Sequence, residues 1–280
     1  MEMNKLPEGC VSTIISLTSP ADACRSSLVS SSFRSAVESD VVWERFLPSD
    51  YQDTISRSGE NNVKNFSSKK ELFLHFCNAV LIDGGKKSFR LEKSSGKKCF
   101  ILSARELSIT WSDNPEFWIW KSSPESRFAE VAELKSVSKL EIEGKIRTQK
   151  LSPNTRYGAY LIMKTNSGAY GLDLVPAETS VEVGSQSVSS NKAYLTNQDA
   201  KKQQMECLFY SNRRQMLKPR VLDSGINGVI ERKDGWMEIE VGEFFNGESD
   251  EMVKMSVREI KGYQLKGGLV IEGIEVRPKK

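Results

Sequence analysis

The stretch Leu107-Ser108-Ile109-Thr110-Trp111 is followed, after the turn residues Asp113-Asn114-Pro115, by Phe117-Trp118-Ile119-Trp120. Apolar and polar residues alternate from Leu107 to Trp111, which predicts a half-buried β-strand. Asp, Asn and Pro then favour a turn. The four apolar residues that follow are consecutive, and a half-buried strand cannot hide all four. At least one large ring is therefore expected on a second surface.

An exposed indole offers a flat apolar face with one N–H donor at its edge. This geometry suits the C–H face of a pyranose, or an apolar side chain of a protein partner. The alternative, that the rings of Trp111, Trp118 and Trp120 all belong to the core of a β-sandwich, is equally compatible with the residues, because Trp is usually mostly buried.

The sequence from about Lys98 to the C-terminus resembles the plant phloem-protein-two and Nictaba-like lectin family. The resemblance includes five further short motifs, which occur in the same order as in the family: Glu143-Gly144-Lys145-Ile146, Arg156-Tyr157-Gly158-Ala159-Tyr160-Leu161, Asp234-Gly235-Trp236-Met237-Glu238-Ile239, Gly242-Glu243-Phe244-Phe245-Asn246 and Gly273-Ile274-Glu275-Val276-Arg277-Pro278. It implies a β-sandwich that binds N-acetylglucosamine oligomers or N-glycans through two tryptophans and two acidic residues. The matching positions are Trp111, Trp118 and Glu259, with Glu251 beside the fourth position, where Met252 stands.

Composition and charge narrow the classes of protein. The 280 residues suggest about two domains, and 40 Lys and Arg against 37 Asp and Glu leave no basic field that would indicate nucleic acid. Neither a secretory signal nor a membrane span is expected, so we predict a cytoplasmic or nuclear protein. The five cysteines are scattered without a CxxC spacing, which favours reduced thiols over disulfides or a metal site.

The first fifty residues predict three short amphipathic helices. Their shared core would be too small to be stable by itself. Either a partner covers an exposed apolar flank, or the helices pack on the rest of the chain. Leu6-Pro7-Glu8, Ser19-Pro20-Ala21-Asp22-Ala23 and Val42-Trp43-Glu44-Arg45-Phe46-Leu47-Pro48 look like an F-box, which docks on the Skp-type adaptor of a cullin–RING ubiquitin ligase. By this resemblance the adaptor-binding residues are Leu6, Pro7, Ile14, Ile15 and Leu17, while Trp43 and Phe46 either brace the third helix or join the adaptor contact.

The remaining pattern predicts an α+β multidomain chain with three parts. Residues 1–48 form the trihelical F-box, and residues 49–97 form a linker that is polar to residue 67 and then contains a buried helix at about 68–83. Residues 98–280 form a mainly antiparallel, jelly-roll-like β-sandwich with many short strands. Within it, 180–204 is expected to be a loop because it is low in apolar residues, and 205–210 is expected to be a strand.

The sequence lacks a catalytic pattern. His75, the single histidine, lies among apolar residues and is a poor catalytic base, and neither a phosphate-binding glycine loop nor a cofactor motif is present. A glycosidase carboxylate pair is not singled out by the sequence. The F-box resemblance implies a non-enzymatic subunit of a Skp–cullin–F-box ubiquitin ligase, in which this chain recognises the substrate. The alternatives are a stand-alone carbohydrate-binding defence lectin, and a sandwich that binds protein without sugar.

Overall fold

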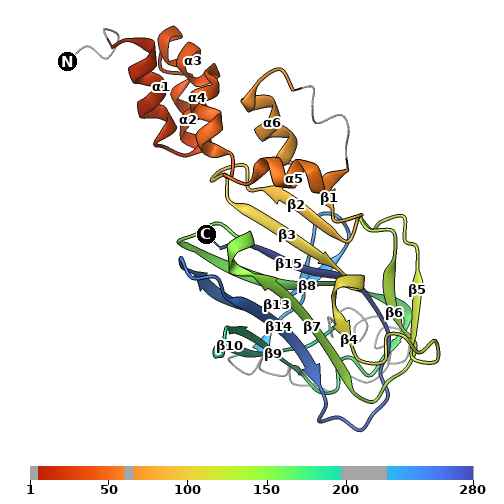
Figure 1. Ribbon diagram of the computed structural model, residues 1–280. Coiled ribbons are helices and arrows are strands. Elements are labelled where there is room, and N and C mark those ends of the chain that lie inside the picture. Colours follow the sequence, from red (N-terminus) through yellow and green to blue (C-terminus); the bar gives the residue numbers. More distant parts are fainter. Residues whose placement is uncertain (1–5, 60–65, 197–225, 280) are drawn as a thin grey trace, which may run out of the picture.

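The chain folds into a group of helices followed by two packed β-sheets (Figure 1). The computed structural model describes residues 6–59, 66–196 and 226–279. In Figure 1 the N-terminal helices lie at the upper left and the sheets below them. The predicted class, an N-terminal helical segment followed by a mainly antiparallel β-sandwich, is confirmed.

The N-terminal segment contains four helices instead of the three expected. They are α1 (Glu8–Ser16), α2 (Pro20–Ser26), α3 (Ser31–Glu38) and α4 (Asp40–Phe46). The fourth helix arises because the chain breaks after Ser26 and Ser30 caps a new helix, its side chain accepting a hydrogen bond from the Phe33 N–H at 3.3 Å. We call α1–α4 the helical module.

The segment expected to be a linker is more structured than predicted. Helix α5 (Tyr51–Ser58) occupies part of the expected polar loop, and the helix expected at 68–83 is shorter, as α6 (Lys69–Phe76). Residues Val80–Ile82 form strand β1, which pairs with β2 (Lys87–Leu91) across a turn at Gly84 and Gly85. A short apolar run is compatible with a helix or a strand, and residues 80–82 form a strand because they pair with β2.

The larger sheet has the strand order β1-β2-β3-β15-β8-β13-β12, with β6 also paired to β15 and β5 paired to β6. Its pairs are all antiparallel in the described residues. The further strands are β3 (Lys98–Ser103), β5 (Trp118–Lys121), β6 (Val131–Leu134), β8 (Thr155–Tyr170), β12 (Ile230–Glu231), β13 (Met237–Asn246) and β15 (Gly267–Pro278). The sheet thus begins at residue 80, well before the sandwich was expected to start.

The smaller sheet has the order β11-β10-β9-β14-β7-β4. Its strands are β4 (Ser108–Ile109), β7 (Leu140–Arg147), β9 (Ala177–Val183), β10 (Gln186–Ala193), β11 (Ile226–Asn227) and β14 (Met252–Glu259). The loop expected at 180–204 is wrong for residues 180–193, which lie in the β9–β10 hairpin. The strand expected at 205–210 lies outside the described residues. Single 3₁₀ turns occur at Ala104–Glu106 and Thr148–Lys150.

One apolar core joins the facing sides of the two sheets. Leu161 and Met163 of β8 and Ile274 of β15 belong to the same buried cluster as Val257 of β14 and Ile142 of β7. The alternation of buried and exposed residues along β7 shows why this strand was predictable, since one face meets the core and the other meets water.

The helical module is fixed to the larger sheet through the turn between β2 and β3. Gly96, in this turn, has φ +72°, and a Cβ there would lie 3.1 Å from the Phe46 carbonyl oxygen. The Ala21 N–H of α2 donates a hydrogen bond to the Ser94 carbonyl at 3.3 Å. Glycine permits both the backbone angle and the close approach.

Charged and aromatic contacts extend the same joint. The buried ammonium of Lys98 in β3 pairs with Asp50, just before α5, at 2.7 Å. Aromatic rings continue from Trp43 to Phe73 at 5.2 Å, and from Phe76 through Phe89 to Phe100 at 5.5 and 5.3 Å between centroids. The helical module and the sheets therefore share a continuous core.

A salt bridge next to the joint ties α5 to the β1–β2 turn. The Arg57 guanidinium bonds the Asp83 carboxylate at 2.8 Å. This hydrogen bond lowers the pKa of Asp83 to about 2.

We predict that Gly96→Ala destabilises the chain more than Gly84→Ala. Both glycines have φ near +70°, so each substitution costs about 1 kcal/mol of backbone strain. A Cβ at Gly84 meets open space, whereas at Gly96 it must displace Phe46, for a total loss of roughly 2–3 kcal/mol. Urea unfolding of the two variants measures the difference, and equal losses would show that the β2–β3 turn is not packed against α4.

Candidate functional site

Helix α1 divides its apolar residues between the core and the surface. Val11 and Ile15 are buried, and the Ser12 hydroxyl donates to the Ala36 carbonyl at 3.2 Å. Ile14 and Leu17 face solvent, with 68% of Leu17 exposed. Three residues apart on a helix turn, these two side chains lie on the same side. Together with exposed Leu6 and Pro7 they form what we call the α1 apolar surface.

Three of the predicted adaptor-binding residues lie inside the helical module. Ile15, Trp43 and Phe46 are buried, and the Trp43 indole donates to the Val37 carbonyl at 2.6 Å. Trp43 and Phe46 pack edge to face at 5.7 Å. Their role in this structure is to brace α4, which was one of the two roles considered for them.

Sequence reasoning missed three further exposed aliphatic side chains of the helical module. Leu28 and Val29 lie between α2 and α3, and Val41 lies on α4. The signal available in the sequence was the break in helical pattern before Ser30, which leaves Leu28 and Val29 in a turn without a helix face to cover them.

The predicted carbohydrate residues Trp111, Trp118 and Glu259 come to one end of the sandwich. Glu259, the last residue of β14, pairs with Leu140 at the start of β7, and the Thr110 N–H bonds the Glu141 carbonyl at 3.1 Å. The Trp118 indole donates to the Thr110 carbonyl at 3.1 Å. We call this the tryptophan end of the sandwich.

Glu251 lies at the other end. It precedes Met252, which pairs with Arg147 at the far end of β7. Eight residue steps along an extended strand separate Glu251 from Glu259 by about 26 Å. The Glu251 carboxylate accepts from the Ser249 hydroxyl at 2.9 Å and lines a different hollow, beside exposed Phe245. The structure therefore does not bring Glu251 to the tryptophans.

Trp111 is exposed and held in an unusual backbone conformation. Its φ is +61°, its side chain is 45% exposed, and its ring packs against that of Phe117 at 5.3 Å. A bulky residue in the left-handed region costs free energy, and such residues cluster at functional sites. Trp111 thus presents an indole to solvent on a turn that is fixed by its neighbours.

Trp118 is a core residue, only 1% exposed. Its neighbour Trp120 is half-buried, donates to the Ser112 carbonyl at 2.9 Å, and carries the Arg105 guanidinium 3.6 Å above its ring. A shallow groove of about 320 Å³ follows the outer edge of these residues. It is lined by Arg105, Ser112, Asp113, Pro115, Trp118, Ile119 and Trp120. Arg105 and Asp113 are polar groups that sequence reasoning did not identify.

Glu259 is also buried, and it holds a loop in place. Its carboxylate pairs with the equally buried Lys266 and accepts from the Gly262 N–H at 2.9 Å. Burial lowers the pKa of the Lys266 ammonium, which in addition donates to the Ser138 carbonyl at 2.6 Å. The loop that Glu259 and Lys266 bracket, residues 260–265, projects Tyr263, 99% exposed, and Leu265 into solvent.

A metal centre is not assembled in the described residues. No group of three or more His, Cys, Asp and Glu side chains with metal-binding geometry occurs within residues 6–59, 66–196 and 226–279. In the same part of the chain no helix has the length and apolar content needed to cross a membrane. What the arrangement offers is two surfaces for binding, one on α1 and one at the tryptophan end.

Comparison with known proteins gives two family matches on the same chain. Residues 97–278 match the family described as Phloem protein 2, and residues 3–45 match the F-box domain. Among Arabidopsis thaliana proteins, "F-box protein PP2-B15" is 55% identical over 98% of this chain and 96% of its own length. "F-box protein VBF" is 54% identical over 99% of this chain and 100% of its own length. "F-box protein PP2-B13" is 54% identical over 99% of both chains.

We predict that Trp118→Ala and Trp111→Ala differ sharply in their effect on stability. Removing the buried Trp118 ring leaves a cavity and an unpaired Thr110 carbonyl, at a cost of about 3–5 kcal/mol in free energy of unfolding. Removing the exposed Trp111 ring costs about 1 kcal/mol or less. Chemical denaturation measures both values. A small loss of stability in Trp118→Ala would contradict the buried position of the Trp118 ring.

Proposed function

Because the chain belongs to the F-box proteins that carry a C-terminal phloem protein 2 domain, we propose that it is the substrate-recognition subunit of a Skp–cullin–F-box ubiquitin ligase. In this proposal the F-box docks on a Skp-type adaptor, and the sandwich binds the client, the protein to be ubiquitinated. The observation that carries the proposal is the α1 apolar surface, which lies within the segment matched by the F-box domain and is not covered by the described part of the chain.

The adaptor contact is assigned to Leu6, Pro7, Ile14 and Leu17. Short aliphatic side chains lose at most about 1 kcal/mol each in rotamer entropy when a partner fixes them, and they gain about 25 cal/mol for each Å² of apolar surface that the partner covers. Ile15, Trp43 and Phe46 contribute indirectly, by holding α1 and α4 in place from the core.

The client contact is assigned to the tryptophan end of the sandwich, with an N-acetylglucosamine oligomer or N-glycan as the recognised group. The exposed Trp111 indole would stack on a sugar ring. Trp118 supports this turn through its hydrogen bond to Thr110, and Glu259 fixes the neighbouring loop. We leave Glu251 out of the proposed site because it lies at the opposite end of the β7–β14 pair from Glu259.

The chain is proposed to act without chemistry of its own. Bringing a client to the ubiquitin-transfer subunits raises its effective concentration there, which converts a bimolecular encounter into a nearly intramolecular one. A cytoplasmic or nuclear location, where such ligases work, follows from this proposal.

One observation favours a sandwich that binds protein without sugar. Trp118 and Glu259 are buried, whereas Tyr263 and Leu265, in the loop that follows Glu259, are exposed. Exposed tyrosine and leucine side chains on a braced loop suit a protein partner. A stand-alone lectin, in contrast, would leave the α1 apolar surface without a function.

We predict that the double substitution Ile14→Ala and Leu17→Ala weakens binding of a Skp-type adaptor by at least about tenfold, because both side chains lose their apolar contact with the partner. Leu81→Ala, at an exposed leucine of β1, is the matched control and should leave binding unchanged. Calorimetric titration of the full chain measures the dissociation constants. Unchanged binding in the double variant would remove the α1 apolar surface from the interface.

We predict that Trp111→Ala weakens binding of a chitooligosaccharide by about tenfold or more, from the loss of one stacking contact. Glu251→Gln should bind as the unchanged chain does. Titration of both variants on the adaptor complex measures this. If only Glu251→Gln lost sugar binding, the sugar site would instead be the hollow beside Phe245. Absence of binding to any glycan, with the adaptor complex intact, would favour recognition of protein.

A further inference from the structure

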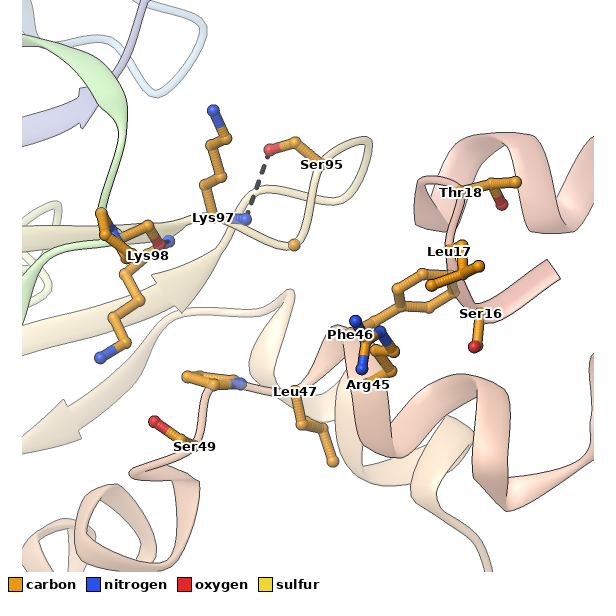
Figure 2. A pocket seen from close by; sticks show the side chains of 14 residues that line it. Ser16, Leu17, Thr18, Arg45, Phe46, Leu47, Ser49, Ser95, Lys97 and Lys98 are labelled. Carbon is orange, nitrogen blue, oxygen red and sulfur yellow. Dashed lines mark hydrogen bonds between the residues drawn. The ribbon is translucent and has the colours of Figure 1, made fainter. Parts of the chain in front are cut away.

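A cleft of about 400 Å³ lies between the helical module and the sandwich. Figure 2 shows its lining: Leu17, Arg45 and Phe46 on the side of the helices, and Ser95, Lys97 and Lys98 on the side of the β2–β3 turn. The volume falls within the range of about 300–1,000 Å³ that small-molecule sites occupy. The cleft is separate from the tryptophan end and opens beside the joint that holds the two parts of the chain together.

The charged side chains that line the cleft are all positive. The 14 lining residues are all in the described part of the chain, and no Asp or Glu is among them. Three are basic and five carry hydroxyl groups: Arg45, Lys97 and Lys98, and Ser16, Thr18, Ser49, Ser95 and Ser152. The hydroxyls of Ser16 and Thr18 already donate to the Thr13 and Ile15 carbonyls, and that of Ser95 donates to the Glu92 carboxylate, so Ser49 and Ser152 are the lining hydroxyls left to a ligand. A lining that combines cations with two such hydroxyls and contains no carboxylate of its own suits an anion.

Two of the three cations are not neutralised. Lys98 is paired with Asp50, but within the described residues Arg45 and Lys97 form no ion pair with a carboxylate. The Ser152 hydroxyl accepts a hydrogen bond from the Lys98 N–H at 3.1 Å, so its own proton is available to an acceptor. Arg45 comes from α4 and Lys97 from the β2–β3 turn, so an anion held by both would bridge the helices and the sheet.

We propose that this cleft binds a small, multiply phosphorylated molecule. Arginine recognises phosphoryl oxygens through paired N–H donors, lysine adds a point charge, and serine hydroxyls complete the contacts. The cleft has room for more than one phosphoryl group, and the separate origins of Arg45 and Lys97 suit a ligand with charges at two places. Binding would add an ionic bridge to the joint and would stabilise the folded chain by mass action.

The test is calorimetric titration of the full chain with inorganic tripolyphosphate at physiological ionic strength. We expect one site per chain. Arg45→Gln and Lys97→Gln should each weaken binding by at least about tenfold, the size expected for losing one charge-assisted contact. Lys233→Gln, which removes an exposed positive charge from the β12–β13 turn outside the cleft, is the matched control and should bind as the unchanged chain does. Arg45→Lys should recover part of the affinity.

The thermal midpoints of the ligand-free variants should match that of the unchanged chain, because Arg45 and Lys97 form no ion pair in the described structure. Weakening by the same factor in Lys233→Gln would overturn the proposal, because it would reveal attraction to net charge only. Unchanged binding in Arg45→Gln and Lys97→Gln would overturn it as well. A phosphoserine peptide that binds more tightly than tripolyphosphate would replace the small molecule by a phosphorylated protein segment.

Discussion

The contact between the β2–β3 turn and the helical module is the constraint on which the arrangement of the chain depends. Gly96 lets the turn approach the Phe46 carbonyl, and Lys98, two residues later, pairs with Asp50 at the entry to α5. Lys98 is buried, so breaking this pair would leave a charge without a partner in a poorly solvated place. Aromatic rings from Trp43 to Phe100 continue the contact into the sheet. The helices are therefore packed on the sandwich and share its core.

A fixed joint gives the two binding surfaces a fixed separation. Helix α1 lies at the upper left of Figure 1, whereas β4 and β5, which flank Trp111, lie toward the lower right. A partner on α1 and a ligand at the tryptophan end would thus be held apart by a rigid body. In the proposed ligase receptor this separation would set where the client stands relative to the transfer subunits.

The sequence predicted the class of fold because its strongest signals were local. Alternation along β7 and capping at Ser19 and Ser68 are readable without tertiary contacts. The β9–β10 hairpin was missed because most of β10 is exposed, so that its residues carry no apolar alternation. In the candidate site, the resemblance led to Trp111, Trp118 and Glu259, but burial is a tertiary property, and neither the core position of Trp118 nor the Lys266 partner of Glu259 could be predicted from spacing. The sequence also could not show that Glu251 lies at the opposite end of the sandwich from Glu259, because this follows from the pairing register of β14 with β7.

The rigid joint can be measured directly as a distance between the two parts of the chain. One spin label would be placed on exposed Cys24 of α2 and a second on Lys233→Cys in the β12–β13 turn, with the remaining cysteines replaced by Ser or Ala. Pulsed dipolar resonance on the full chain should give a single narrow distance distribution, unchanged when a Skp-type adaptor binds. A broad distribution, as expected for modules joined by a flexible linker, would contradict the account.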